Sequence, residues 1–297
     1  MKGLVIINGY PNGEKFLRQG ERIAEELRLL GVQTDVVKNG EVCAILNADG
    51  SVKTDLAERY SFAVYLDKDK YLGKLLEESG LRLLNSARAV ETCDDKMLTY
   101  LALTGKGIPL AKTIPAPLCF TPNASPSEQF LKTVATELGF PLVAKKSYGS
   151  FGAGVQLVHG VSELYKTEQA WLHTPHFYQE FVEESAGRDI RVIVIGGKAV
   201  AAMERVAQEG EFRSNVELGG QGKQVLLDEQ YASVAEKAAQ ALGLDYCGVD
   251  LLEGKEGPIL CEVNSNAFFE GLEKTTGINV AKAYAQYILK CFSRKNS

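Results

Sequence analysis

The residue types best suited to chemistry lie in one stretch, residues 246–267. Two apolar runs flank a polar Glu-Gly-Lys-Glu-Gly segment, a pattern that predicts a β-hairpin. If residues 255–257 form the loop, with glycine taking the positive φ, Asp250 lies directly opposite Glu262. Because side chains alternate across a strand, Asp250, Glu262 and Asn264 share one face. The opposite face, toward the core, then carries Val249, Leu251, Cys261 and Val263.

This predicted face suggests a metal site. Two carboxylates that are directly opposed across a strand pair repel each other, and a divalent cation between them removes the repulsion. Carboxylate and amide oxygens are the ligands that Mg²⁺ or Mn²⁺ prefers, usually together with phosphate oxygens. The alternative is a solvated face whose acids point into water. Spacing alone leaves both interpretations open.

A glycine-rich loop lies between two predicted strands in residues 141–158. Backbone N–H groups in such a loop can close over phosphates as a flap. It is neither a Walker A loop nor a Rossmann loop, because GK[ST] and a following helix are missing. Lys145 or Lys146 enters beside it, and parity does not decide which one faces a ligand. The alternative is a flexible hairpin without a ligand. The small residues of the loop are Gly149, Ser150, Gly152 and Gly154.

Further polar side chains lie along the predicted strands of residues 176–206. Glu180 and Phe181 end one strand, a place where a carboxylate and backbone groups can contact a base and a ribose. Asp189 and Arg191 share one face of the next strand, which turns back at a Gly-Gly hairpin.

A polar loop follows at residues 210–222 and contains Arg213 and Asn215. These side chains could clamp an anion, or they could be solvated. Lys96 lies at the start of a predicted helix that Asp94 or Asp95 would cap. Such a lysine by itself is usually an ordinary surface residue.

The elements that must position these residues indicate an α/β protein. The first 84 residues alternate between predicted strands and helices, which indicates a small, mostly parallel sheet. The glycine-rich turn after the first strand does not fit GxGxxG, so we expect no dinucleotide site there. The predicted strands are 4–8, 32–37, 43–46, 62–66 and 81–84, and the predicted helices of the whole chain include 14–30, 69–79, 228–242 and 279–292.

Composition limits the function classes. The 297 residues suffice for two or three domains, and the net charge of −5 argues against a general nucleic-acid or anionic-membrane binder. No apolar run approaches the roughly 20 residues of a membrane span. Six scattered cysteines without a CxxC pair are typical of free thiols in a reducing compartment. We therefore expect a cytoplasmic protein with neither nucleic acid nor membrane as a partner.

These separate signals occur in one fixed order, and together the sequence resembles the ATP-grasp superfamily, specifically the RimK-like carboxylate–amine (alpha-L-glutamate) ligases. The resemblance covers about residues 85–290 and is carried by GRDIRVIVIGGKAVAAMER, FRSN, GVDLL and CEVNSN. It implies an α+β ATP-grasp fold. Residues 1–92 would be an α/β pre-ATP-grasp domain, residues 93–182 a central subdomain with the flap, and residues 183–297 a C-terminal subdomain with the metal site. The two subdomains would clasp ATP between them.

The resemblance also implies a role for each matching residue. Lys96 and Lys145 would hold ATP phosphates beneath the flap. The adenine would meet Glu180 and Phe181. The remaining roles are Asp189 for the ribose, Arg191, Arg213 and Asn215 for the transferred phosphoryl group, and Asp250, Glu262 and Asn264 for two Mg²⁺ or Mn²⁺ ions.

The implied reaction activates a carboxylate as an acyl phosphate, which an amine then attacks to give an amide. The substrates would be an amino acid such as glutamate and a peptide, protein or small carboxylate. Related ligases that act on acidic peptides often carry basic residues after RSN, whereas this chain has Val-Glu-Leu at 216–218, which argues against an acidic peptide. Two alternatives are a nucleotide-binding regulator without turnover and a ligase of the D-Ala–D-Ala or glutathione-synthetase type. A homo-oligomer would fit the family.

Overall fold

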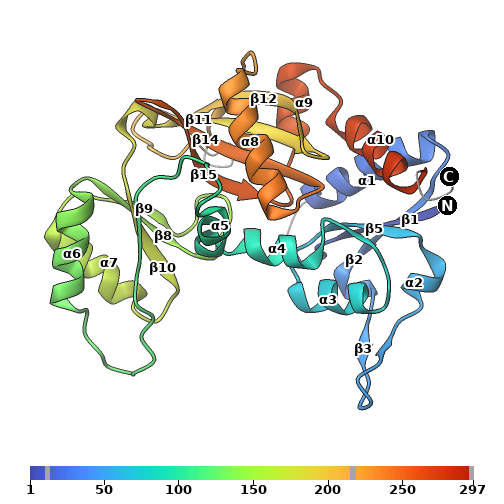
Figure 1. Cartoon of the computed structure of the whole chain (residues 1–297), viewed down its shortest axis with the longest axis horizontal. Coiled ribbons are helices and arrows are strands. Elements are labelled where there is room, and N and C mark those ends of the chain that lie inside the picture. The colour runs from blue at the N-terminus through green and yellow to red at the C-terminus, as the bar shows by residue number, and fades with distance from the viewer. Residues whose placement is uncertain (11–13, 215–218, 294–297) are drawn as a thin grey trace.

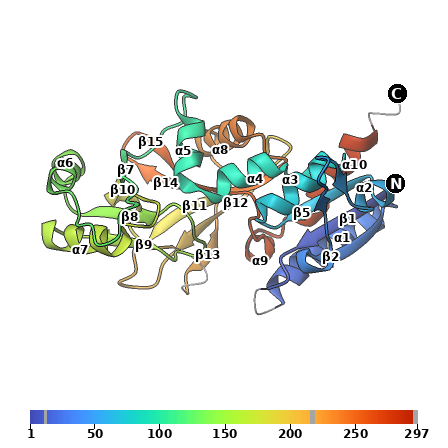
Figure 2. The same cartoon turned by 90° about the horizontal axis from the view of Figure 1, so that it is seen from below.

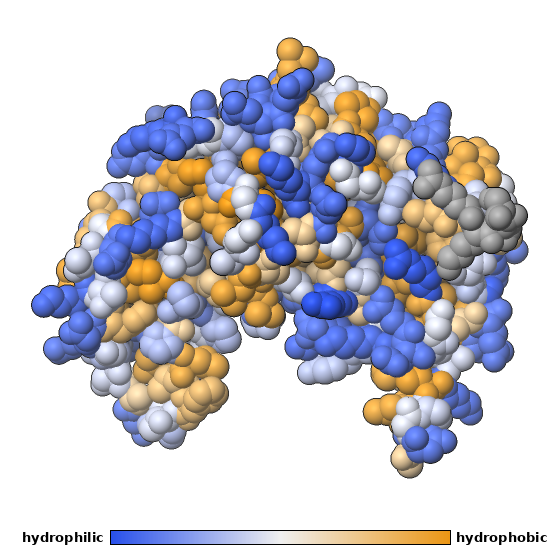
Figure 3. Space-filling view, in the orientation of Figure 1, coloured by the Kyte–Doolittle hydropathy of each residue, from blue (hydrophilic) through white to orange (hydrophobic). Residues whose placement is uncertain are grey.

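The computed structural model describes residues 1–10, 14–214 and 219–293. Its three main sheets follow one another along an arched molecule, with the N-terminal sheet at one end and the central sheet at the other (Figure 1). The surface is hollowed between these two ends (Figure 3). The predicted mixed α/β class is confirmed. In the described part of the chain, no helix is both long enough and apolar enough to cross a membrane.

The N-terminal sheet is parallel, as predicted, in the order β2-β1-β5-β6. Alternation along β1 separates two cores, because Val5 and Ile7 pack toward α1 and α10 while Leu4 and Ile6 pack toward α2 and α3. The strands are β1 Lys2–Ile7, β2 Gln33–Lys38, β5 Phe62–Leu66 and β6 Leu83–Leu84. The helices are α1 Lys15–Leu29, α2 Leu56–Arg59, α3 Lys70–Glu78 and α10 Val280–Ser293.

A short antiparallel hairpin lies outside this sheet. The strand expected near residues 43–46 is β3 (Ile45–Leu46), which follows a 3-10 turn at Asn39–Glu41 and pairs with β4 (Val52–Lys53). The hairpin projects from the N-terminal end of the arch (Figure 1). Ile45 and Leu46 are exposed there, which explains why they add nothing to the core.

Four antiparallel strands in the order β7-β10-β8-β9 form the central sheet. Two helices cover one face of it, α6 (Glu128–Leu138) and α7 (Val161–Trp171), and neither is among the helices predicted from the sequence. Seen from below, α4 (Ala87–Asp94) and α5 (Lys96–Leu103) run between this sheet and the N-terminal one (Figure 2). The strands are β7 Thr113–Pro115, β8 Leu142–Lys146, β9 Val155–Val158 and β10 His176–Glu180.

The C-terminal sheet has the order β13-β12-β11-β14-β15 and lies between two helical layers. One face packs on α8 (Glu229–Leu242), and the other packs on α9 (Glu270–Thr276) and α10. The expected turn at Gly196-Gly197 joins β11 to β12, with both glycines at positive φ. The elements are a 3-10 turn Glu183–Ser185, β11 Arg188–Ile195, β12 Lys198–Val206, β13 Gln221–Gln224, β14 Tyr246–Gly254 and β15 Gly257–Asn264.

The β14–β15 hairpin differs from the predicted hairpin in its loop. Gly254 pairs with Gly257, so the loop is one residue shorter than expected. The predicted pairing of Asp250 with Glu262 is nevertheless confirmed, because the register shifts between Asp250 and Leu251. This β-bulge leaves Cys261 without a partner residue and turns it off the core face, so its predicted place beside Val263 in the core was wrong.

Asn85 joins the N-terminal sheet to the C-terminal one. Its buried amide donates to the carbonyls of Tyr246 and Ser265 at 2.7 and 2.9 Å. Its oxygen accepts from the backbone N–H groups of Asp245 and Tyr246 at 2.6 and 2.9 Å. The division of the chain at 92/93 and 182/183 stays a prediction, and the first of these boundaries falls within α4.

Candidate active site

Two adjoining cavities lie where the three sheets meet. The inner cavity, between the central and C-terminal sheets, is lined by Val143, Lys145, Glu180, Phe181, Phe212 and Leu252. The outer cavity, on the side of the N-terminal sheet, is lined by Asn8, Phe16, Asp67, Asn264, Asn266 and Phe268. Both are bounded by Lys96, Gly149, Ser150, Phe151, Arg205 and Glu262. The glycine-rich loop is therefore a wall of both cavities.

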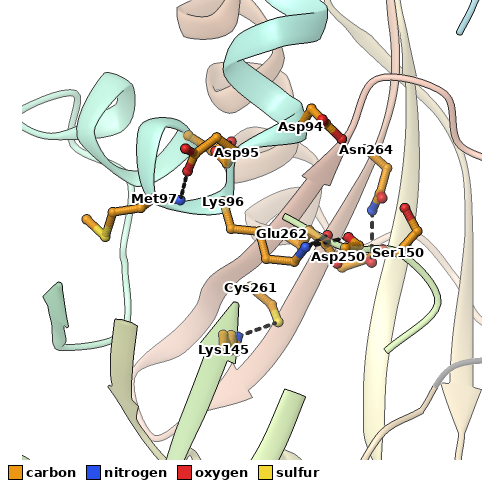
Figure 4. A network of polar contacts seen from close by, with 12 residues as sticks. Asp94, Asp95, Lys96, Met97, Lys145, Ser150, Asp250, Cys261, Glu262 and Asn264 are labelled. Carbon is orange, nitrogen blue, oxygen red and sulfur yellow. Dashed lines mark hydrogen bonds and ion pairs between the residues drawn. The ribbon is translucent and has the colours of Figure 1, made fainter. Parts of the chain in front are cut away.

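Of the two adjacent lysines on β8, Lys145 faces the inner cavity. Its buried Nζ donates to Gln179 Oε1 at 2.8 Å. The same nitrogen lies 3.7 Å from Cys261 Sγ (Figure 4). Burial alone would lower the pKa of Lys145, but the neighbouring Cys261, Tyr100 and Glu262 raise it above the ordinary value, so the ammonium stays charged. Lys146 instead lies over the ring of Trp171.

Lys96 enters from the first turn of α5, which Asp95 caps by accepting from the N–H groups of Met97 and Leu98 at 2.9 and 3.1 Å. Its Nζ donates to the carbonyl of Gly149 at 2.7 Å and lies 3.3 Å from Glu262 Oε1 (Figure 4). Lys96 thus connects the glycine-rich loop to the acidic hairpin.

The backbone of the glycine-rich loop requires its glycines. Gly149, Gly152 and Gly154 have φ values of 143°, 74° and 74°. A Cβ on Gly149 would lie 2.9 Å from the carbonyl oxygen of Ala153. The folded loop leaves room for no larger side chain at that point.

Arg213 contacts this loop from the polar segment. Its Nη1 donates to the carbonyl of Gly152 at 3.0 Å, while Nε and Nη2 donate to Glu211 at 3.0 and 2.8 Å. The hydrogen bond from Arg213 lowers the pKa of Glu211 to about 2. The guanidinium is therefore oriented at the rim of the inner cavity.

The acidic face of the hairpin meets two arginines. Arg191 donates two hydrogen bonds of 2.7 Å to Asp250, and Arg205 Nη2 lies 2.9 Å from Asp250 Oδ2. Burial would raise the pKa of Asp250, but Arg191 and Arg205 hold it below the ordinary value. Asn264 Nδ2 donates to Asp250 Oδ2 at 3.3 Å. The negative charge that a metal would neutralise is neutralised here by side chains.

These residues fit a divalent cation only together with a nucleotide. Asp250, Glu262 and Asn264 supply oxygen atoms, the ligands of Mg²⁺ or Mn²⁺. Among residues 1–10, 14–214 and 219–293, no three His, Cys, Asp or Glu side chains gather as a metal-ligand group. An ion held here would therefore take further oxygens from phosphate, which is the usual arrangement for Mg²⁺.

The remaining predicted residues are placed as follows. Glu180 Oε1 accepts from the backbone N–H of Lys112 at 2.7 Å, and Phe181 lines the same inner cavity. Asp189 is buried and paired with Arg205. Arg191 lines the outer cavity. Asn215 lies outside the described residues, so its predicted role stays a prediction.

Sequence reasoning missed several lining residues. Arg205 pairs with both Asp189 and Asp250. The available signal was its position near the end of β12, the strand that follows β11. Asp67, at the end of buried strand β5, was detectable as an acid directly after an apolar run. Cys261 could be found only by knowing of the bulge. Phe16 and Phe268 belong to no sequence motif that would indicate a site.

Both the sequence and the fold are similar to those of known ligases. The model of the RimK-like ATP-grasp domain matches residues 93–288. The chain belongs to this family. A probable alpha-L-glutamate ligase of Legionella pneumophila (strain Corby) is 38% identical over 217 residues, which are 72% of this chain and 69% of that protein. Human beta-citrylglutamate synthase B is 36% identical over 228 residues, which are 75% of this chain and 57% of that protein.

A solved structure extends the likeness to almost the whole chain. The D-alanine–D-alanine ligase from Bacillus anthracis complexed with ATP superposes with a TM-score of 0.72 at 18% identity, covering 98% of this chain and 96% of that one. The likeness shows a shared ATP-grasp fold. With the family match, it makes this RimK-like chain an ATP-dependent carboxylate–amine ligase.

Proposed function

We propose that the two cavities divide the ligase reaction between them, with ATP in the inner cavity and the carboxylate and amine in the outer one. The observation that carries this proposal is the shared boundary, where Lys96, Glu262 and the glycine-rich loop face both cavities. A phosphoryl group at this boundary is within reach of substrates on either side.

Each residue then has a role in holding the nucleotide. Lys96 and Lys145 neutralise phosphate charge, and the glycine-rich loop covers the phosphates with backbone N–H groups. Phe181 and Glu180 contact the adenine, and Asp189 contacts the ribose. Asp250, Glu262 and Asn264 would hold two Mg²⁺ or Mn²⁺ ions. When bound, these ions supply charge neutralisation at the β- and γ-phosphates.

The reaction proceeds in two steps. A carboxylate oxygen of the first substrate attacks the γ-phosphorus, the bond to the β-phosphate oxygen breaks, and the products of this step are an acyl phosphate and ADP. The amine nitrogen then attacks the carbonyl carbon of the acyl phosphate, the bond from that carbon to the phosphate oxygen breaks, and phosphate leaves with the proton that the amine gives up as the amide forms. Arg191, Arg213 and Asn215 stabilise the transferring phosphoryl group. The closed loop excludes water that would hydrolyse the acyl phosphate.

The names of both relatives specify glutamate, so glutamate is the first amino acid to test. We also propose a cytoplasmic location, which the free cysteines of the described residues support. Homo-oligomer formation stays a prediction.

The test measures ADP release with Mg²⁺ across amino acids and di-acids, with mass spectrometry of the products. A condensation product lighter by one water identifies both substrates. Glu262→Gln should abolish turnover, whereas Glu256→Gln, on the exposed turn of the same hairpin, should not. ATP binding without ADP release in any mixture would favour a nucleotide-binding regulator instead.

A further inference from the structure

The outer cavity contains a buried carboxylate with an unused oxygen. Asp67, which is 2% exposed, follows β5 and lines this cavity. Its Oδ1 accepts from Asn8 Nδ2 at 2.9 Å and from the backbone N–H of Lys68 at 2.7 Å. Its Oδ2 is buried and has no hydrogen-bond partner among the described residues. Since buried polar atoms are almost always paired, this oxygen indicates a ligand that donates hydrogen bonds.

The cations that line the same cavity are already paired. Lys68 Nζ lies 2.6 Å from Asp94 Oδ1, Lys96 Nζ lies 3.3 Å from Glu262 Oε1, and Arg191 is bound to Asp250. Arg205 is likewise shared between two carboxylates. An ammonium group in this cavity would therefore supply the donor that Asp67 Oδ2 lacks. An additional carboxylate would have to displace one of the carboxylates that already pair with these cations.

An aromatic wall faces these charges. Phe268 contacts Phe16 edge to face at 5.0 Å between ring centroids and stacks on Phe151 at 6.2 Å. Lys15 Nζ lies 4.0 Å from the centre of the Phe268 ring, on which its charge is stabilised. Phe151 adopts φ 58°, an unfavourable backbone angle for a residue with a side chain. The glycine-rich loop thus presents an aromatic ring at a position where glycine would be the unstrained residue.

The wall and the carboxylate lie beside the site of phosphoryl transfer. Lys68, adjacent to Asp67 in the chain, donates from Nζ to Ser150 Oγ of the loop at 3.1 Å. Asp67 therefore neighbours a residue that contacts the glycine-rich loop, which in the proposed function covers the phosphates.

We propose that the outer cavity binds the amine substrate, with the ammonium group on Asp67 and an apolar or aromatic side chain against Phe16, Phe151 and Phe268. The inference rests on the proposed function and narrows the amine substrate to amines with an apolar or aromatic side chain. L-Glutamate is the competing amine, and a direct binding comparison distinguishes the two.

Direct binding tests this assignment without requiring turnover. Calorimetry on the full chain with Mg²⁺ and a non-hydrolysable ATP analogue compares L-phenylalanine, N-acetyl-L-phenylalanine and L-glutamate. We expect L-phenylalanine to bind at least tenfold more tightly than either of the others. Asp67→Asn, which keeps an oxygen for Asn8 and Lys68, should lose at least tenfold in L-phenylalanine affinity and keep its affinity for the ATP analogue. Asp49→Asn, in the remote β3–β4 turn, is the matched control.

Equal or tighter binding of L-glutamate, equal binding of the acetylated compound, or no binding of L-phenylalanine would overturn the assignment. So would an Asp67→Asn protein with unchanged L-phenylalanine affinity. If that variant folds poorly, Phe268→Ala decides by the same comparison, since it removes the wall and leaves Asp67 in place. Absent ADP release with normal L-phenylalanine binding would count against the ligase reaction only.

Discussion

The sulfur of Cys261 lies 3.7 Å from the ammonium nitrogen of Lys145, on the surface of the inner cavity. The bulge in β15 creates this contact, because an unbroken ladder would have turned Cys261 to the core. Burial raises the pKa of the Cys261 thiol above its ordinary value, although the Lys145 ammonium opposes the shift.

Enlarging Cys261 should therefore obstruct the nucleotide. Cys261→Phe is expected to weaken ATP binding at least tenfold, about 1.4 kcal/mol, because the ring would occupy the space beside Lys145. Cys43→Phe, at an exposed cysteine, should leave the affinity unchanged. Titration of a fluorescent ATP analogue measures both. Unchanged ATP affinity in the Cys261 variant would place the nucleotide elsewhere.

Arg205 should be required for stability as well as for the site. It is buried and pairs with Asp189 and Asp250, which are also buried. Arg205→Met leaves two carboxylates short of a partner, so we expect a loss of about 3–5 kcal/mol in unfolding free energy. Arg82→Met removes a half-exposed partner of Asp245 and should cost at most about 1 kcal/mol. Urea unfolding compares them, and equal losses would contradict the buried network.

The contact between the N-terminal and C-terminal sheets should depend on Asn85. Asn85→Ala leaves the backbone groups that it now satisfies buried and unpaired, so we expect a loss on the order of 3 kcal/mol or more. The control is Asn47→Ala, which removes an exposed side-chain hydrogen bond to Ser51. Thermal unfolding measures the difference. A shift no larger than that of the control would show that this contact is not stabilising.

Asp245 should make stability depend on pH. Burial raises its pKa above the ordinary 3.8, although Tyr287 and Arg82 oppose the shift. A raised folded-state pKa stabilises the fold fully below the unfolded value, and this contribution is lost as pH rises through the folded value. Relative to Asp245→Asn, the wild type should therefore lose stability between about pH 4 and the raised folded pKa. Parallel pH profiles of unfolding free energy for the two proteins would refute this.

Much of the fold and the site could be predicted because it follows from local patterns of apolar and polar residues along the sequence. The alternation of β1 and the amphipathic spacing of α1 are local properties, and the acidic face of the hairpin follows from parity. The two helices of the central subdomain, at 128–138 and 161–171, were not predicted, although the N-cap Ser127 is a start signal for the first of them. The bulge at Cys261 could not be predicted, since Asp250 opposes Glu262 either with a longer loop or with a bulge. The aromatic wall joins residues from three distant segments, a tertiary arrangement that no local pattern encodes.

The glycine-rich loop forms a wall of both cavities, and this shared wall should affect the order in which the substrates bind. The loop that lines the inner cavity also shapes the outer one, because Phe151 stacks on Phe268 and Ser150 accepts a hydrogen bond from Lys68. We therefore expect ordered binding, in which ATP binds first and the amine binds only weakly to the protein without nucleotide. ADP would then dissociate last. The glycine-rich loop would thus make binding of the amine depend on ATP already being bound.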